Sequence, residues 1–324
     1  MCTAVSWNGS EHYFGRNLDL HHSYGESVVI TPRNFPFLFR NGASLTQHFG
    51  IIGVATVVNG YPLYYDATNE KGLSIAGLNF PVSAFYPEEK SEHENIAPFE
   101  LIPWILGQCS SVDEAAGLLE NINLVNTPFS EDLPLTPLHW IISDAVRSIT
   151  VESTADGLHI YPNEIGILTN EPPFDYHCFN LQNYLHLGAA PAENRFCPGF
   201  PLNSFSNGSG SFGLPGDFTS ASRFIRAAFV KLNSYAGSTE DENISQFFHI
   251  LDSVAMPKGC VQMPSGEFEI TRYSSCCNTR KGSYYYTTYD NRQITRVDMH
   301  QEDLDQTNLI SYPLLTSGAV IHQN

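Results

Sequence analysis

A cysteine stands at position 2, directly after the initiator methionine. If Met1 is removed, Cys2 becomes the first residue and carries both a thiol and a free α-amino group. A thiol is a good nucleophile once it ionises. A terminal amine has an ordinary pKa of about 7.7–8.0, so it can act as a general base near neutral pH. The sequence therefore predicts a nucleophile and its base on one residue, although a lone cysteine here is more often inert.

The residues after Cys2 predict a β-hairpin. Residues 3–7 are typical of a strand, Asn8-Gly9 favours a tight two-residue turn, and residues 12–17 form the returning strand. This pairing brings Arg16 and Asp19 back toward the start of the chain. An acid there can hold the amine of Cys2, and an arginine beside the thiol favours the thiolate. The alternative is a surface ion pair at a strand end, worth about 0–1 kcal/mol.

The composition bounds the classes of protein and partner. The chain has 324 residues, of which 42% are hydrophobic, and no stretch is typical of a linker, so we expect a single domain over residues 2–324. Acidic residues number 34 against 16 basic ones, giving a net charge of -18. A nucleic-acid partner needs a basic surface, so none is expected.

No stretch has the length and apolar purity of a membrane-spanning helix, and the first residues lack the pattern of a secretory signal. We therefore expect no membrane partner and a cytoplasmic location. The 7 cysteines are odd in number and irregular in spacing, which favours reduced thiols over a disulfide framework.

The order of the expected elements indicates the fold class. Strands and helices occur in separate blocks and do not alternate strictly, which predicts an α+β fold with largely antiparallel sheets. Strands are expected at residues 27–31, 51–58, 73–78, 138–143, 149–153, 157–161, 165–168, 284–289, 293–299 and 309–312. Helices are expected at residues 98–109, after a capping box that begins at Ser111, and at residues 222–232 and 243–254.

The sequence does not support a nucleotide-binding, metal-binding or serine-nucleophile site. Residues 208–213 match a dinucleotide-binding glycine pattern, but a polar loop precedes them and Pro215 follows where a helix should begin. No paired spacing of Cys and His indicates a metal site, and no nucleophile elbow is present. We expect neither cofactor nor metal. The neighbouring Cys276 and Cys277 lack the CxxC setting of a redox thiol, which leaves Cys2 as the best candidate nucleophile.

Blocks spread along the whole chain, taken together, resemble the choloylglycine hydrolase family. They are residues 1–4 with 13–19, 69–73 with 76–80, 168–170 with Pro172 and Phe174, 214–217 with 222–224, and 285–291. The family comprises amidases with an N-terminal nucleophile, among them bile salt hydrolases and penicillin V acylases. The resemblance implies a four-layer αββα sandwich, removal of Met1 and a homotetramer.

The resemblance also implies catalytic residues, namely Cys2, Arg16, Asp19, Asn79, Asn170 and Arg223. Cys2 is the implied nucleophile and its own amine the proton relay, with Asp19 holding the amine and Arg16 acting on the thiol. Amide hydrolysis passes through a tetrahedral oxyanion, and losing one donor to it costs about 2.7–4 kcal/mol. The side chain of Asn79, helped by Asn170, is implied as that donor. Arg223 is implied to support the charged transition state.

Taken singly, these last residues have simpler interpretations. Asn79 and Asn170 each follow a short apolar run and are typical of turns, and Arg223 stands near the start of a predicted helix. Only their joint occurrence with Cys2 favours the catalytic interpretation. Glu171 departs from the family, whose members often have Asn or Ser there, and it adds a carboxylate that could weaken binding of anionic conjugates slightly.

Asn at position 79 resembles the bile-salt branch, whereas penicillin V acylases typically carry Tyr there. The implied reaction is hydrolysis of glycine- and taurine-conjugated bile salts in an intestinal bacterium. A steroid needs an apolar cleft, and the candidate lining residues are Leu18, Tyr24, Val58, Tyr65 and Phe129. The alternatives are a penicillin V acylase and a non-catalytic steroid-binding protein. The net charge excludes none of these, because charges beyond about 8 Å are largely screened at physiological salt.

Overall fold

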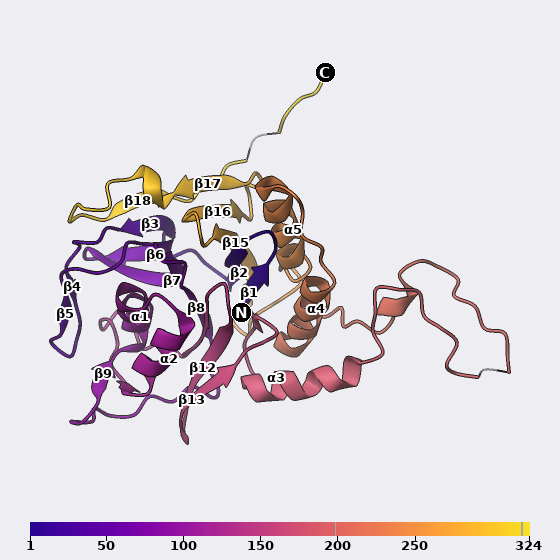
Figure 1. Ribbon diagram of the computed structural model, residues 1–324, viewed down its shortest axis with the longest axis horizontal. Helices are drawn as coiled ribbons and strands as arrows, with labels where there is room; N and C mark the ends of the chain where they lie inside the picture. Colours follow the sequence, from indigo (N-terminus) through magenta and orange to yellow (C-terminus); the bar gives the residue numbers. More distant parts are fainter. Residues whose placement is uncertain (198, 319) are drawn as a thin grey trace.

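The computed structural model describes residues 1–197, 199–318 and 320–324, and its core is four layers deep. Two large antiparallel sheets pack face to face, and helices cover the outer face of each (Figure 1). The predicted α+β class and four-layer αββα sandwich are therefore confirmed. Among the described residues, no helix is long and apolar enough to cross a membrane.

The first sheet has six strands, and the chain begins in the strand that is second from one edge. Its order is β14 (Ile167–Leu168), β1 (Cys2–Asn8), β2 (His12–Leu20), β15 (Ile270–Asn278), β16 (Ser283–Thr288) and β17 (Thr295–Asp298). Helices α4 (Ser220–Leu232) and α5 (Glu240–Asp252) pack on its outer face. The predicted hairpin is confirmed, with Ala4 opposite Arg16, but its turn was predicted wrongly. Asn8 pairs with His12, so the loop is residues 9–11 and not Asn8-Gly9.

The second sheet has eight strands. Its order is β13 (Gly157–Pro162), β12 (Ser148–Thr154), β11 (Leu138–Ser143), β8 (Ser74–Asn79), β7 (Tyr61–Asn69), β6 (Ile51–Val58), β3 (Ser27–Thr31) and β18 (Ile310–Pro313). Helix α1 (Leu101–Gln108) contacts its outer face, and α2 (Val112–Leu119) shares that apolar core. Two small pairs, β4 (Phe37–Leu38) with β5 (Ser44–Leu45) and β9 (Glu94–Ile96) with β10 (Ile122–Leu124), lie outside it.

Inner strands of the second sheet, such as β8 and β11, are buried on both faces, which explains their continuous apolar runs. In β8, Ala76 and Leu78 join the core shared with the first sheet, while Ile75 joins the core beneath α1. Successive side chains of a strand point to opposite faces, so both layers draw on the same strands. Such runs are easy to find, and the bounds predicted for β3, β6 and β11 are those observed.

Other predicted bounds differ. The helix at 98–109 is a short 3-10 turn, Pro98–Glu100, followed by α1, and the helix at 243–254 is α5, which begins and ends earlier. Ser111 caps α2 as predicted, but Glu114 accepts hydrogen bonds from Ser110 and not from Ser111, so the capping box is incomplete. Strands β7 and β15, the helix α3 (Phe174–Asn180) and the short strands β4, β5, β9 and β10 were not predicted.

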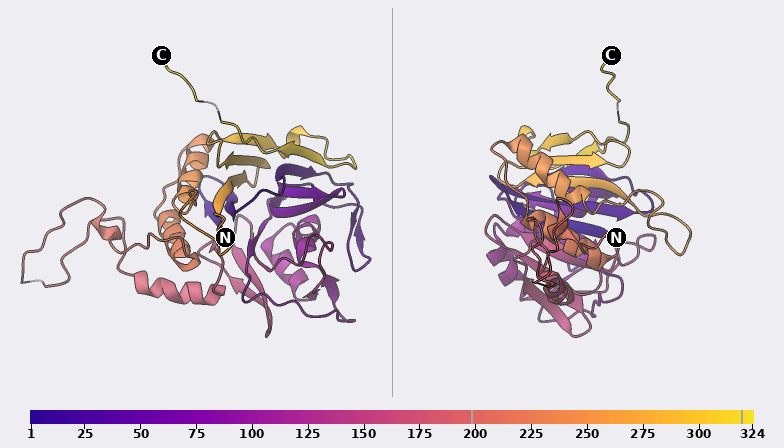
Figure 2. Two further views of the ribbon diagram at one scale, coloured as in Figure 1. Left: turned by 180° about the vertical axis from the view of Figure 1, so that it is seen from behind. Right: turned by 90° about the vertical axis from the view of Figure 1, so that its right-hand side faces the viewer.

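After α3 the chain leaves the body as an arm, residues 185–215, and returns to begin α4 (Figures 1 and 2). Short 3-10 turns, Leu181–Tyr184 and Ser209–Ser211, lie at its base and near its end. Large apolar side chains are exposed along it, namely Leu185, Phe196, Phe200, Leu202, Phe205 and Phe212. The glycine pattern at residues 208–213 lies in this arm, which confirms that it is not a dinucleotide-binding turn.

Candidate active site

Cys2 is the first residue of β1 and is 3% exposed. Its main chain is fixed on both sides. The Cys2 N–H donates to Asn170 Oδ1 (2.8 Å), and the Cys2 carbonyl accepts from Arg223 Nη1 (2.5 Å). Arg223 Nη1 also donates to Thr3 Oγ1 (2.7 Å). The thiol-bearing residue is therefore held by groups from two distant parts of the chain.

Asn170 joins three elements at this point. Its Oδ1 also accepts from Arg223 Nη2 (2.7 Å), and its Nδ2 donates to the carbonyl of Asn79 (2.7 Å). Its own N–H donates to Ser220 Oγ (2.8 Å) at the start of α4. Asn170, which follows β14, thus binds both Asn79 at the end of β8 and Ser220 at the start of α4.

Arg223 is fully buried, and burial lowers the pKa of its guanidinium while Asp19 and Cys2 act in the opposite direction. Its Nη1 and Nη2 donate to oxygens of Cys2, Thr3 and Asn170, and its Nε donates to the carbonyl of Phe218 (3.1 Å). This arginine is therefore placed to fix the Cys2 main chain and Asn170.

Arg16 lies in β2 and is fully buried between the two sheets. Its Nη1 donates to the carbonyls of Tyr65 (2.8 Å) and Gly77 (2.6 Å), whereas Nε and Nη2 have no hydrogen-bond partner among the described residues. Burial opposes the charge on Arg16, but electrostatic interactions with Cys2, Tyr273 and Asp66 outweigh it, so the pKa of Arg16 is raised. Arg16 pairs with Ala4, two residues along β1 from Cys2, so the side chains of Arg16 and Cys2 lie on the same face of the sheet.

Asp19 is fully buried in the same strand, and burial raises the pKa of its carboxyl group against the effects of the N-terminal ammonium and Arg223. One carboxylate oxygen, Oδ1, accepts from Thr271 Oγ1 (2.6 Å), and Oδ2 has no partner in the described chain. The ammonium group of Met1 donates to the carbonyl of Asp19 (2.9 Å) and to Glu269 Oε1 (3.0 Å). A buried acceptor next to the N-terminus is therefore left free.

Asn79 differs from the other candidates because its side chain is exposed at the end of β8. Its carbonyl is bound by Asn170, and its side chain makes no hydrogen bond to the residues that the structure describes. An amide donor at the protein surface next to Asn170 is free to bind a ligand. The sequence-predicted set thus comes together, with Cys2, Asn170 and Arg223 in direct contact and Arg16, Asp19 and Asn79 beside them.

The residues predicted to line a steroid cleft lie in different surroundings. Leu18 is buried opposite Cys2, and the carbonyl of Tyr65 binds Arg16, so these two adjoin the site. Tyr24 is 45% exposed and packs against His22 with the two rings tilted, while Phe129 packs on Tyr61. Val58 is partly buried at the end of β6. Their role stays a prediction.

Several groups around the site were not predicted. Thr3 binds Arg223, Ser220 binds Asn170, Glu269 binds Met1, and Thr271 binds Asp19. Asp66 accepts hydrogen bonds from Tyr273 (2.5 Å), Tyr284 (2.6 Å) and Ser275 (3.2 Å). Thr271 belongs to β15, one of the strands that were not predicted. Residues 270–278 show no regular alternation of apolar and polar residues, so no local signal marks this strand.

Glu171 is engaged by a neighbouring loop. Its carboxylate accepts from the N–H groups of Val82 and Ser83 (both 2.8 Å) and from Ser83 Oγ (2.9 Å). Glu171 therefore ties the residue after Asn170 to the loop after Asn79.

The other candidate sites are unsuited to the same chemistry. Cys276 and Cys277 are buried, and burial raises the pKa of Cys277 to about 12 and that of Cys276 well above its usual range, so both thiols stay protonated and inert. In the part of the chain that the structure describes, no group of His, Cys, Asp and Glu could hold a metal ion.

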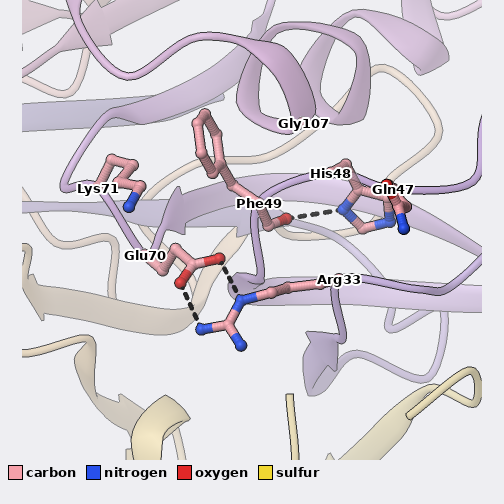
Figure 3. A pocket seen from close by; sticks show the side chains of 7 residues that line it. All are labelled: Arg33, Gln47, His48, Phe49, Glu70, Lys71 and Gly107. Atoms are coloured by element: carbon pink, nitrogen blue, oxygen red, sulfur yellow. Dashed lines mark hydrogen bonds and ion pairs between the residues drawn. The ribbon is translucent and has the colours of Figure 1, made fainter. Parts of the chain in front are cut away.

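An open pocket of about 530 Å³ lies elsewhere, between Arg33, Phe49, Lys71 and Gly107 (Figure 3). The guanidinium of Arg33 forms a two-pronged ion pair with Glu70, with distances of 2.9 and 2.7 Å, and His48 binds the carbonyl of Phe49. None of the predicted site residues lines this pocket. It is a separate surface feature beside α1.

The choloylglycine hydrolase family of linear amide C–N hydrolases matches residues 2–312. The chain belongs to this family. It is therefore an enzyme, and the alternative of a non-catalytic steroid-binding protein loses its support. A relative from Lactiplantibacillus plantarum, named "Bile salt hydrolase/transferase", is 54% identical over 314 residues, which are 97% of each chain.

Solved structures agree with this assignment. A mutant conjugated bile acid hydrolase from Clostridium perfringens is 39% identical and superimposes with a TM-score of 0.92 over 100% of both chains. A penicillin V acylase from Agrobacterium tumefaciens has a TM-score of 0.76 at 20% identity, over 96% of this chain and 90% of its own, and so shares the fold.

Proposed function

We propose that the enzyme hydrolyses the amide bond of glycine- and taurine-conjugated bile salts, releasing the bile acid and the amino acid. The observation that carries the proposal is the 54% identity, over almost the full length of both chains, to a relative named for bile salts. The convergence of Cys2, Asn170 and Arg223 supports a cysteine as the nucleophile.

Removal of Met1 is the first step of the proposed mechanism. It turns the amide nitrogen of Cys2 into an amine and takes away the methionine ammonium that Glu269 and the Asp19 carbonyl bind. The free Oδ2 of Asp19 is the acceptor that we assign to the new N-terminus. A buried carboxylate without a partner is costly, and that cost is removed when the Cys2 amine takes up a proton beside it.

Attack then follows on the substrate carbonyl. The Cys2 amine takes the thiol proton, the sulfur forms a bond to the carbonyl carbon, and the carbonyl oxygen becomes an oxyanion. The buried charge of Arg16 favours negative charge on the sulfur. The exposed amide of Asn79, held through its carbonyl by Asn170, is the proposed donor to the oxyanion.

Collapse of the oxyanion breaks the C–N bond. The Cys2 ammonium gives its proton to the leaving nitrogen, so glycine or taurine departs as the free amine and a thioester remains. Water then attacks the thioester with the same amine as general base, and the bile acid is released. Arg223 acts throughout by holding the Cys2 carbonyl and Asn170 in place.

Leu18, Tyr24, Val58, Tyr65 and Phe129 are the proposed contacts of the steroid. Leu18 and Tyr65 adjoin the thiol and Arg16, which favours them over the other three. A cytoplasmic location belongs to the same proposal, and cell fractionation with an antibody against the chain tests it.

We also propose a homotetramer in which the arm at residues 185–215 binds a second copy. Its exposed phenylalanines, among them Phe196 at 91% and Phe205 at 94%, support this, because large apolar side chains in contiguous exposed segments mark interaction sites. Light scattering on the purified protein tests the tetramer. A monomer with an intact arm contradicts it.

The experiment that tests the activity joins intact mass with an assay. The purified protein is weighed, then incubated with taurocholate, glycocholate and penicillin V, and released amine is measured. Loss of one methionine together with release of taurine or glycine supports the proposal. If a protein that has lost Met1 releases amine from penicillin V alone, the proposed mechanism stands, but its substrate is penicillin V and not a bile salt.

A further inference from the structure

A buried pair of titratable side chains, His139 and Glu152, lies beside the site and takes no part in the proposed chemistry. His139 is on β11, where it pairs with Leu78 of β8, and Glu152 is on β12. Both side chains are completely buried. His139 Nδ1 lies 2.9 Å from Glu152 Oε1. Charged groups are rarely buried without a function or a full set of partners, so the pair requires an explanation.

The partners of the His139 ring indicate its charge. Nδ1 faces the Glu152 carboxylate, and Nε2 lies 3.0 Å from the carbonyl oxygen of Thr169. Both partners are acceptors, whereas a neutral imidazole carries only one N–H. The Glu152 oxygens also accept from the N–H of Phe174 (3.1 and 3.2 Å), and hydrogen bonds accepted by a carboxylate favour its ionised form, so the proton between the two side chains belongs to Nδ1. The geometry fits an imidazolium bound to a carboxylate.

The contacts of His139 lead to the two asparagines of the site. The Thr169 carbonyl that it binds immediately precedes Asn170. Its ring stacks face to face on Phe80, with centroids 4.3 Å apart and planes 7° apart, and Phe80 immediately follows Asn79. A cation over an aromatic face is attracted to it. One side chain therefore holds the chain neighbours of both Asn79 and Asn170.

A second histidine holds Asn170 from the other side. His177 Nε2 lies 2.9 Å from the Asn170 carbonyl, and burial, together with the charge at His139 and Arg223, lowers the pKa of His177 to about 4. His177 is thus neutral and needs only one acceptor, and its Nδ1 has no partner among the described residues. His139, with two acceptors, thus fits a charged ring, whereas His177, with one acceptor, fits a neutral ring.

We infer that His139, held as an imidazolium by Glu152, is a positioning residue that sets Asn79 and Asn170 relative to Cys2. The inference rests on the proposed function of that site. Asn170 binds both the Cys2 nitrogen and the Asn79 carbonyl, so a shift of Thr169 or Phe80 moves the proposed oxyanion donor and the nucleophile together. Such displacements affect the rate of the chemical step more than they affect substrate binding.

The first test is kinetic and uses three variants of the full chain. His139→Phe keeps a ring for stacking but has no N–H, and Glu152→Gln removes the charge at little change in shape. His12→Phe is the matched control, because His12 is also buried and hydrogen-bonded, through Ser6, Ser143 and Thr279, but contacts neither asparagine segment. Steady-state hydrolysis of taurocholate gives kcat and KM for each, and chemical unfolding gives the stability.

We expect His139→Phe and Glu152→Gln to lower kcat about 10- to 100-fold with little change in KM. The double variant should lose no more than the larger single loss, since the two residues act as one unit. His12→Phe should keep the wild-type kcat even if its unfolding free energy falls as much as that of His139→Phe. A kcat for His139→Phe no lower than that of the control overturns the inference, whereas an inactive wild type with Met1 removed overturns the proposed function instead.

The second test needs no variant to be active. Nitrogen NMR of histidine-labelled wild-type protein at about pH 8 detects protonated rings, because a histidine of ordinary pKa, about 6.5, is neutral there. We expect a ring with protons on both nitrogens, whose signals are absent from the His139→Phe spectrum. A singly protonated ring at His139 overturns the inference whatever the kinetics give.

Discussion

The layer between the two sheets and the layer beneath α1 and α2 bury different kinds of side chain. Between the sheets lie charged and polar groups, among them Arg16, Asp66 and His12, each bound across the layer to the opposite sheet. Beneath α1 and α2 the core is mainly apolar, with Ile75, Ile105 and Trp140 among its members. The same strands of the second sheet serve both layers. The comparison indicates that one layer provides stability while the other positions charge.

The largest expected effect separates chemistry from folding. Cys2→Ala removes the proposed nucleophile, and we expect it to abolish taurocholate hydrolysis, with a loss in kcat of about 10⁴-fold or more. The unfolding free energy should change by less than about 1–2 kcal/mol, because Ala differs from Cys by one atom in the core. Amino-acid release and urea unfolding measure the two quantities. Retained turnover contradicts the assignment of Cys2.

The apolar layer should respond in the opposite way. Ile105 is completely buried on α1, so Ile105→Ala is expected to cost about 2–5 kcal/mol of unfolding free energy by leaving a cavity. The kcat measured well below the unfolding transition should stay that of the wild type, because α1 contacts the second sheet on the face away from Cys2. A large fall in the kcat of folded Ile105→Ala would contradict the view that the apolar layer contributes stability and not catalysis.

Acid should weaken the layer between the sheets through His12. Burial lowers the pKa of His12 from 6.5 to about 4, so the unfolded chain binds a proton more readily than the folded one. The resulting stability is complete above pH 6.5 and is lost as the pH falls toward 4, amounting to about 2–3 kcal/mol. Urea unfolding of the wild type and His12→Gln at neutral pH and near pH 4.5 measures it. An equal acid loss in both proteins contradicts this account.

The smallest expected effect lies at the edge of the apolar layer. Ser111 caps α2 by accepting from the N–H of Glu114 (3.2 Å), and Ser111→Ala should cost about 1 kcal/mol. Thermal unfolding of Ser111→Ala beside the wild type measures the loss. No change in kcat is expected, and any clear change would show that α2 is coupled to the site.

The fold was predictable where apolar runs are continuous. Strands β3, β6 and β11 are rich in β-branched and aliphatic residues, and their predicted bounds match the structure. Strand β15 was missed because its buried positions include Thr271, Ser274 and Ser275, whose burial depends on hydrogen bonds that only the folded chain supplies. A strand held by polar contacts has no hydrophobic signature.

The site was predictable in part, and for a different reason. Hairpin pairing alone brings Arg16 toward Cys2, as expected from residues 2–20. Asn79, Asn170 and Arg223 lie far away in the sequence, and only the resemblance to a family indicated them. Glu269 and Thr271, which adjoin or belong to strand β15, could not be found because nothing local marks them as neighbours of the N-terminus.

The contact between the Met1 ammonium and Glu269 has a practical consequence for producing this enzyme. The first residue is partly buried and its amine is already bound, so a purification tag fused ahead of it would have to displace that contact and would prevent an aminopeptidase from reaching Met1. The C-terminus extends away from the body of the molecule in Figures 1 and 2. A tag belongs at that end, and a host with ample methionine aminopeptidase should give the most active preparation.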